Sequence, residues 1–282
     1  MELRRAYRWI NILLFPIIFI TPAYAVEKTP AIIIPYDTIS SPGIVVWPQA
    51  KVLTKKFQIM ERPVSGERIE FLEEDRYLGL ALTGGDGIGV IRYTPLNEGI
   101  HKIKVKIQSG SAYAAEDREM LIGVWDRSKG LLIISVEAMQ EKPKGGIFPF
   151  FGKIKKDTGR HPLDQAVNVL SDLSKRFNII YLSYSESSNL AEIKTWLNKN
   201  KFPDSPLLIW DDNKRLINNL ISGRKKDIRG VVLTSGDKAD IFQKEQIRTL
   251  VLTEKKKGTE NKKGLKEAII VTDWKEIKKE IE

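Results

Sequence analysis

The chain has 282 residues, with 46 Lys and Arg against 36 Asp and Glu, no Cys and two His. This length predicts two domains, and 42% hydrophobic with 29% charged residues is typical of a globular chain. The lack of Cys excludes disulfides, Cys-based zinc or iron–sulfur sites and thiol nucleophiles, while two imidazoles argue against multi-histidine metal sites and His-relay hydrolases. Any chemistry must therefore use carboxylates, hydroxyls and amines.

Residues 1–25 have the pattern of a secretory signal peptide. Three Arg precede the almost wholly apolar stretch from Trp9 to Ile20, and Ala23-Tyr24-Ala25 has the A-x-A form of a cleavage site. The alternative is a membrane anchor, but about a dozen apolar residues interrupted by Pro16 are too few to cross roughly 30 Å of hydrocarbon. We predict cleavage between Ala25 and Val26 and export to the periplasm or the cell exterior.

The mature chain is expected to be basic. Because the first 25 residues hold three Arg and one Glu, their removal lowers the net charge from +10 to +8. Such an excess suits an anionic ligand, an anionic lipid surface or solubility alone. The Lys and Arg are spread along the chain, and export also argues against nucleic acid, so we predict no nucleic-acid partner.

Residues 26–122 are predicted to form an all-β immunoglobulin-like sandwich. In His101–Ile107, apolar residues alternate with Lys, as in a strand with one buried face. Gly84-Gly85-Asp86-Gly87 separates two further strand-like segments, Leu78–Thr83 and Ile88–Tyr93, and has the composition of a turn. Short strands at such spacing favour a sandwich.

Four stretches of this segment resemble bacterial immunoglobulin-like domains of surface and exported proteins: Ser65–Phe71, Leu78-Gly79, Thr83–Gly89 and Tyr93–Gly99. The resemblance implies a spacer or an adhesion unit rather than a catalyst.

Residues 123–282 are predicted to form an α/β domain with a doubly wound parallel sheet. Uniformly apolar runs indicate strands covered on both faces, at Leu131–Val136, Ile179–Leu182, Pro206–Trp210, Gly230–Leu233, Thr249–Leu252 and Ala268–Val271. Helical spacing appears in Leu163–Phe177, with Pro162 expected in its first turn, and in Ala191–Leu197 and Lys275–Ile281. In this architecture ligands bind at the carboxyl ends of the strands.

The segment from about 130 to 250 resembles the haloacid-dehalogenase-like (HAD-like) phosphatase superfamily, and within it the lipin/LNS2 branch. The resemblance to that branch rests on Gly146–Lys153, Arg160-His161-Pro162, Ile180–Ser183, Ala191-Glu192, Thr195-Trp196-Leu197, Phe202-Pro203 and Pro206-Leu207-Leu208. Lipins are magnesium-dependent phosphatidate phosphatases, so the resemblance implies a Mg²⁺ site and a phosphate site in an active relative.

The family motif Asp-x-Asp-x-Thr corresponds here to Ser135, Glu137 and Met139. The resemblance implies that the attacking Asp is replaced by Ser135, which is a poor nucleophile without a base and brings no charge to a divalent cation. Glu137 remains as a candidate acid or base.

By the same resemblance, Ser183 corresponds to the hydroxyl that binds a phosphate oxygen and Lys214 to the cation that neutralises phosphate. Asp237 and Asp240 correspond to the acidic motif of the metal site. The alternatives are a helix cap for Ser183, a surface cation for Lys214, with Lys225 and Lys226 as competitors, and a turn residue for Asp237.

Phe148-Pro149-Phe150-Phe151 follows the first strand of this domain. It is interpreted either as an exposed apolar segment for a lipid or partner surface, or as a cluster packed over the sheet.

Three functions follow from these patterns. The favoured hypothesis is an exported protein whose degenerate, non-catalytic phosphatase-like domain binds a protein or an anionic or phosphorylated ligand and needs no cofactor. The second is a Mg²⁺-dependent phosphatase of phosphatidate-like or other phosphomonoesters that uses Glu137. The third is a surface adhesion protein that acts through the β-domain.

Overall fold

The computed structural model describes residues 27–56, 60–141, 161–184, 189–210, 220–221, 223–234, 236–253 and 268–282. The predicted signal peptide, the aromatic stretch at 148–151 and Lys214 lie outside these ranges. Within them, no helix has the length and apolar character needed to cross a bilayer.

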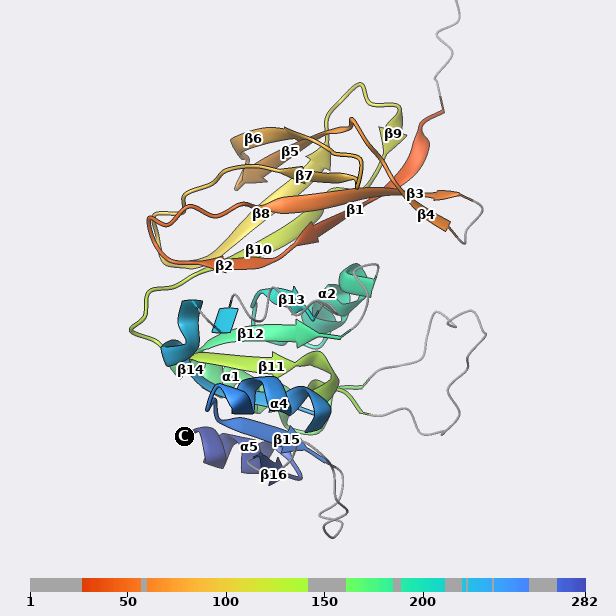
Figure 1. Ribbon diagram of the computed structural model, residues 1–282. Helices are drawn as coiled ribbons and strands as arrows, with labels where there is room; N and C mark the ends of the chain where they lie inside the picture. Colours follow the sequence, from red (N-terminus) through yellow and green to blue (C-terminus); the bar gives the residue numbers. More distant parts are fainter. Residues whose placement is uncertain are drawn as a thin grey trace, which may run out of the picture.

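The N-terminal part is a sandwich of two sheets (Figure 1). One sheet has the order β4-β3-β1-β9, with β7 also paired to β3, and the other has the order β2-β10-β8-β5-β6. The first contains β1 (Thr29–Tyr36), β3 (Gln49–Lys56), β4 (Met60–Pro63), β7 (Ile88–Val90) and β9 (Tyr113–Ala114). The second contains β2 (Thr38–Ser40), β5 (Arg68–Glu73), β6 (Arg76–Leu82), β8 (Gly99–Ile107) and β10 (Arg118–Val124).

The sandwich core follows from alternation along the strands. In β8, Ile103 and Val105 are fully buried, whereas Lys102 and Lys104 face solvent. Because successive side chains of a strand point to opposite faces, this alternation turns one face of β8 towards the other sheet. The same core contains Ile33, Val52, Ile69, Phe71, Met120 and Ile122.

The turn before β7 has the chemistry that its sequence predicts. Gly87 has φ +78°, and a Cβ built there would lie 2.6 Å from the carbonyl oxygen of Val52. The Asp86 Oδ1 accepts a hydrogen bond of 3.0 Å from the Ile88 N–H. Asp86 is therefore a turn residue, and Gly87 is required both by its backbone angle and by the close approach of β3.

The C-terminal part contains a parallel sheet of order β13-β12-β11-β14-β15-β16. Its strands are β11 (Leu131–Ser135), β12 (Asn178–Ser183), β13 (Leu207–Ile209), β14 (Ile228–Leu233), β15 (Thr249–Leu252) and β16 (Ile269–Val271). The helices are η1 (Val136–Met139), α1 (Ala166–Arg176), α2 (Leu190–Lys199), η3 (Lys225–Asp227), α4 (Gly236–Lys244) and α5 (Trp274–Ile281). Numbered from β11, the strand order is 3-2-1-4-5-6, a doubly wound arrangement.

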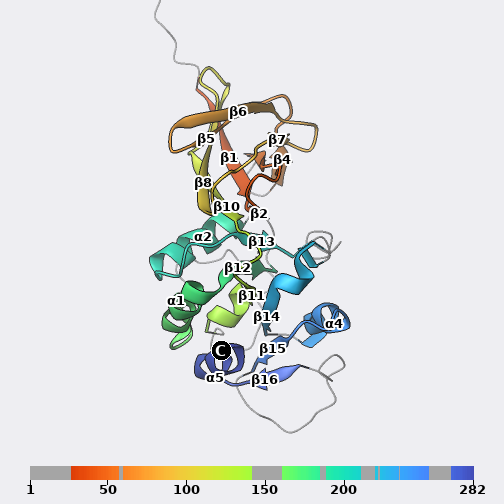
Figure 2. The same cartoon turned by 90° about the vertical axis from the view of Figure 1, so that its left-hand side faces the viewer.

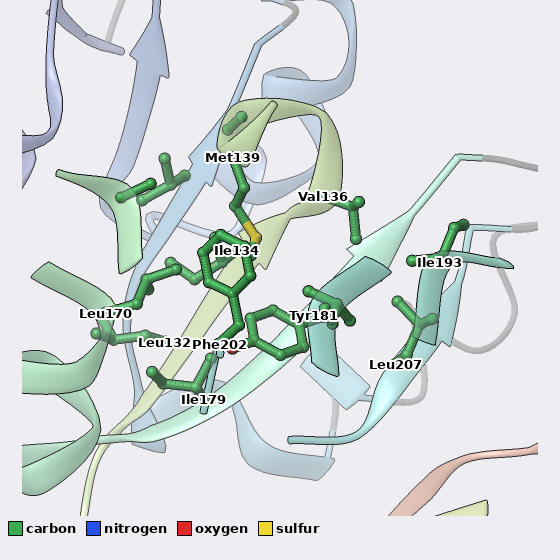
Figure 3. Close-up of a cluster of buried hydrophobic side chains, with 14 of the residues drawn as sticks. Leu132, Ile134, Val136, Met139, Leu170, Ile179, Tyr181, Ile193, Phe202 and Leu207 are labelled. Atoms are coloured by element: carbon green, nitrogen blue, oxygen red, sulfur yellow. The ribbon is translucent and has the colours of Figure 1, made fainter. Parts of the chain in front are cut away.

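The two faces of this sheet are covered by different helices. Leu132 and Ile134 of β11 pack with side chains of α1, α2 and α5, whereas Leu131 and Ile133 pack with Ala239 and Phe242 of α4. Figure 2 shows α1 and α2 on one side of the sheet and α4 on the other. Figure 3 shows the first cluster, in which Leu132, Ile134 and Tyr181 lie among side chains from the covering helices. The runs of β11, β12 and β15 are thus strands covered on both faces, as predicted, whereas the edge strand β16 exposes Ile270.

The predicted start of the first helix is wrong. Pro162 forms a β-bridge with Gln140, and the Leu163 N–H bonds to the Met139 carbonyl oxygen, so this stretch is extended rather than helical. The helix α1 begins at Ala166, after Gln165 with φ 64°. The tertiary pairing with the segment after η1 outweighs the preference of Pro for a first helical turn.

The coarse fold prediction is confirmed: a sandwich of mainly antiparallel strands, with the parallel pairs β1–β9 and β2–β10, precedes a parallel α/β sheet. The predicted boundary between residues 122 and 123 falls within β10, and β11 begins at Leu131.

Candidate functional site

The carboxyl ends of the parallel strands carry a series of hydroxyl side chains. Ser135 ends β11 and Ser183 ends β12, and Thr234, Thr253 and Thr272 follow β14, β15 and β16 directly. The winding of the chain reverses between β11 and β14, and in doubly wound sheets ligands bind at this point. The candidate site is the region around the ends of β11, β12 and β14.

Ser135 is fully buried and serves as a helix cap. Its Oγ accepts a hydrogen bond of 3.2 Å from the Ala138 N–H, at the start of η1. The segment from Ser135 to Gln140 contains no Gly, so it lacks the Gly-rich turn with which dinucleotide-binding domains of this strand order approach a pyrophosphate. The hydroxyl thus contributes to the local structure of η1.

Glu137 turns its carboxylate towards the next strand. Its Oε1 accepts a hydrogen bond of 3.2 Å from the Tyr184 N–H, so the carboxylate joins the ends of β11 and β12. Glu137 also lines a cavity of about 140 Å³, shared with residues that follow β14, β15 and β16. The other lining residues are Gln140, Leu163, Asp164, Thr234, Leu252, Thr253, Thr272, Asp273 and Trp274.

Two of the polar groups around this cavity have structural roles. Asp273 Oδ1 caps α5 by accepting from the Glu276 N–H at 2.8 Å. The Trp274 Nε1–H donates to the Ala138 carbonyl oxygen at 3.1 Å and so ties α5 to η1. Within the described ranges, the Gln140 amide nitrogen is buried without an acceptor.

An aromatic group with a cation lies beyond β12 and β13. Tyr184 packs edge-on against Trp210, with 5.5 Å between the ring centroids, and Trp210 packs on Phe242 of α4. The Lys238 Nζ lies 3.0 Å from the Tyr184 ring centroid and 5.9 Å from that of Trp210, a cation–π arrangement. Burial, and then the charge of Glu137, raise the pKa of the Tyr184 hydroxyl, so this phenol stays protonated at neutral pH.

The structure brings some of the predicted site residues together. Ser135, Glu137 and Ser183 lie at the adjoining ends of β11 and β12, and Ser183 is fully buried. Asp237 and Asp240 belong to α4, which follows β14; Asp240 is half-buried, and the side chain of Asp237 lies outside the described part. Lys214 also lies outside it.

No group of three or more His, Asp or Glu side chains that could hold a metal ion occurs in the part of the chain that the structure describes. Glu137, Asp164 and Asp273 line the same cavity but do not form such a group.

Sequence reasoning missed Tyr184, Trp210 and Lys238. Tyr184 and Trp210 directly follow β12 and β13, and Lys238 lies in the first turn of the helix after β14. The rule that ligands bind at the carboxyl ends of parallel strands could have indicated all three. Their mutual packing could not be predicted, because it depends on the order of the strands in the sheet.

Comparisons with known proteins give no family. No protein-family model and no curated protein matches the chain. The fibronectin(III)-like modules of Clostridium thermocellum CbhA match at 15% identity, with 33% of this chain and 94% of that chain covered and a TM-score of 0.24. A CARDB domain from Pyrococcus furiosus matches at 10% identity, with 35% and 99% covered and a TM-score of 0.25.

A longer match is a carbohydrate acetylesterase from Xanthomonas citri, at 10% identity over 78% of this chain and 58% of that chain, with a TM-score of 0.29. At such identities and TM-scores, none of these similarities relates the chain to a function.

Proposed function

We propose that this is an exported protein whose α/β domain is a phosphatase-like module of the HAD type, in the lipin/LNS2-like branch, that has lost catalysis. The module binds an anionic ligand, of which a phosphate monoester is the chemistry that the resemblance implies. The immunoglobulin-like sandwich precedes this module in the chain. The observation that carries the proposal is that Ser135 is buried and hydrogen-bonded. It occupies the position where the resemblance requires the attacking Asp.

Ser135 is unsuited to attack on phosphorus. Its side chain is fully buried, and its Oγ accepts from the Ala138 N–H. A neutral hydroxyl supplies no charge to Mg²⁺, which is bound through carboxylates and phosphates. Loss of an attacking group costs several orders of magnitude in rate. The strand order supports the resemblance to the HAD-like superfamily, because Ser135 and Glu137 lie at the switch point of the sheet.

A lysine lies close to the carboxyl ends of β12 and β13. Lys238 lies in the first turn of α4, and its Nζ lies over the Tyr184 ring. Lysine binds phosphate as a point charge, and the N-terminal end of a helix also favours an anion. Binding without turnover is the function that these groups support.

The first test measures catalysis. Protein lacking residues 1–25 is incubated with Mg²⁺ and either p-nitrophenyl phosphate or phosphatidate, and phosphate release is followed. We expect no release above a protein-free control. A turnover that Glu137→Gln abolishes would contradict the proposal and favour an active phosphatase.

The second test measures binding of inorganic phosphate and of a short-chain phosphatidate by calorimetry. We expect Lys238→Ala to weaken binding of the preferred probe by about tenfold, the loss of one charge-assisted contact. Lys244→Ala is the matched control, because Lys244 lies in the last turn of the same helix. Equal affinities of the two variants, or no binding of either probe to the wild type, would refute the proposed anion site.

A further inference from the structure

A buried carboxylate lies between the sandwich and the α/β domain. The side chain of Asp37, between β1 and β2, has 0% exposure. Its Oδ1 accepts from the Leu121 N–H of β10 at 2.7 Å and from the Lys194 Nζ of α2 at 2.6 Å. Its Oδ2 accepts from the Leu207 N–H of β13 at 2.8 Å. One side chain thus binds three elements in two domains.

The contact with Leu207 is at the open edge of the parallel sheet. The strand β13 is the terminal strand on this side, has only three residues and pairs with β12. An edge strand presents backbone groups that lack a partner strand. Asp37 supplies the acceptor that a further strand would supply, so the sandwich satisfies the Leu207 N–H at this edge.

The edge strand leads directly to the candidate site. Trp210 follows β13, its N–H bonds to the Ser183 carbonyl oxygen at 2.8 Å, and its ring packs against Tyr184. Leu207 is three residues before Trp210. A displacement of β13 would therefore move the aromatic group over which Lys238 lies.

Burial and polar partners make Asp37 a strong link between the sandwich and the α/β domain. Burial raises the pKa of Asp37, and Lys194 with the two backbone N–H groups opposes this shift. The apolar cluster of the α/β domain continues into the sandwich through Ile34 and Leu53, and a cavity of about 250 Å³ lies beside Asp37 and its partners. A second ion pair crosses between the domains, Lys102 with Asp204 at 2.8 Å, but both side chains are 49% exposed. Such an exposed pair contributes little.

We infer that Asp37 is a positioning residue: its contacts with Lys194, Leu121 and Leu207 form an interdomain latch through which the sandwich holds β13 and the Tyr184–Trp210 pair in place. The domains therefore have one fixed orientation, and the sandwich determines the geometry of the candidate site. The three contacts of Asp37 do not depend on what the site binds.

The test uses the chain without residues 1–25, carrying Asp37→Ala, labelled with 5-fluorotryptophan. Amide hydrogen exchange in residues 203–210 should become at least about tenfold faster, because the Leu207 N–H loses its acceptor and the edge opens locally. The fluorine resonance of Trp210, assigned with Trp210→Phe, should shift, whereas that of Trp47 in the sandwich should not.

Asp204→Ala is the matched control, because it removes the exposed pair across the same interface. It should leave the Trp210 resonance unchanged. If Asp37→Ala does not fold, Asp37→Asn keeps one acceptor oxygen and should give the same changes at smaller size. Wild-type exchange in residues 203–210 together with an unshifted Trp210 resonance in the folded variant would overturn the inference.

Discussion

Individual side chains in this protein are held by donors and acceptors that come from distant parts of the chain. Glu73 of β5 accepts from the Tyr93 hydroxyl at 3.0 and 3.1 Å, from Arg76, and from His101 Nδ1 at 2.5 Å. The His101 Nε2 lies 2.8 Å from the Asn97 carbonyl oxygen. The Tyr93 hydroxyl also lies 3.2 Å from His101 Nδ1, so Glu73, Tyr93 and His101 form one network.

This network makes a prediction about pH. Partial burial acts to raise the pKa of Glu73, but hydrogen bonds from His101, Arg76 and Tyr93 outweigh it and hold the pKa below its ordinary value. The ionised form therefore stabilises the folded state at neutral pH. This contribution is lost as the pH falls through the lowered pKa.

We expect Glu73→Gln to reduce the free energy of unfolding by about 2 kcal/mol at pH 7, the size of charge-assisted hydrogen bonds. Urea titrations from pH 7 to pH 3 should show the difference from wild type shrinking at the acid end. Glu74→Gln is the control, since Glu74 is an exposed neighbour. A difference that grows towards acid pH would contradict the assignment.

At the scale of elements, helix ends depend on single polar residues. The helix α5 begins with Asp273, whose Oδ1 accepts from the Glu276 N–H, while Glu276 Oε2 accepts from the Thr272 N–H at 2.8 Å. The pattern differs from a capping box, because Glu276 bonds the N–H of Thr272, the residue before the N-cap, and not that of the N-cap Asp273. Trp274 and Ile277 of the same helix are buried against the sheet.

We expect Asp273→Ala to destabilise the protein by about 1 kcal/mol, the usual cost of removing an N-cap side chain. The measurement is the midpoint of chemical unfolding. Asp273→Asn, which keeps an acceptor oxygen, should recover most of the loss. An Ala variant as stable as the wild type would show that packing of Trp274 alone determines the N-terminal end of α5.

At the scale of the molecule, Arg224 forms another attachment between the domains. The Arg224 guanidinium donates to the Trp125 and Asp126 carbonyl oxygens at 3.1 and 2.8 Å, to Ser41 Oγ at 3.1 Å and to Asp227 at 2.7 Å. Its side chain is 10% exposed. It therefore fixes the connection between β10 and β11, at a distance in sequence from the Asp37 latch.

We expect Arg224→Met to cost about 3 kcal/mol, because a buried Asp227 carboxylate and the two carbonyl groups lose their donor. Limited proteolysis should also cut the connection at residues 126–130 faster. Arg127→Met is the control, because Arg127 is 70% exposed and lies 4.0 Å from the same carboxylate. Equal losses in the two variants would refute this role for Arg224.

Element types could be predicted wherever a local pattern determined them. The alternation in β8 and the uniformly apolar runs of β11 and β12 indicate strands, because a buried face of a strand requires apolar residues at its positions. Pro162 misled the prediction because pairing of its segment with Gln140 is a long-range contact. Ser183 is the last residue of β12, and Glu137 lies in η1 just after β11. The hydrogen bond between Glu137 and the Tyr184 N–H could not be predicted, because it joins residues that are far apart in the sequence.

The sequence by itself determined two classes of sheet, their approximate strands and the lack of thiol chemistry, since these depend on composition and short-range periodicity. Only the tertiary structure decided what Asp37 and Arg224 do. In the sequence they are one acidic residue before a short strand and one member of the basic run Arg224-Lys225-Lys226. Their roles arise because folding buries each of them against backbone groups roughly 80 to 180 positions away, where a charge must find partners.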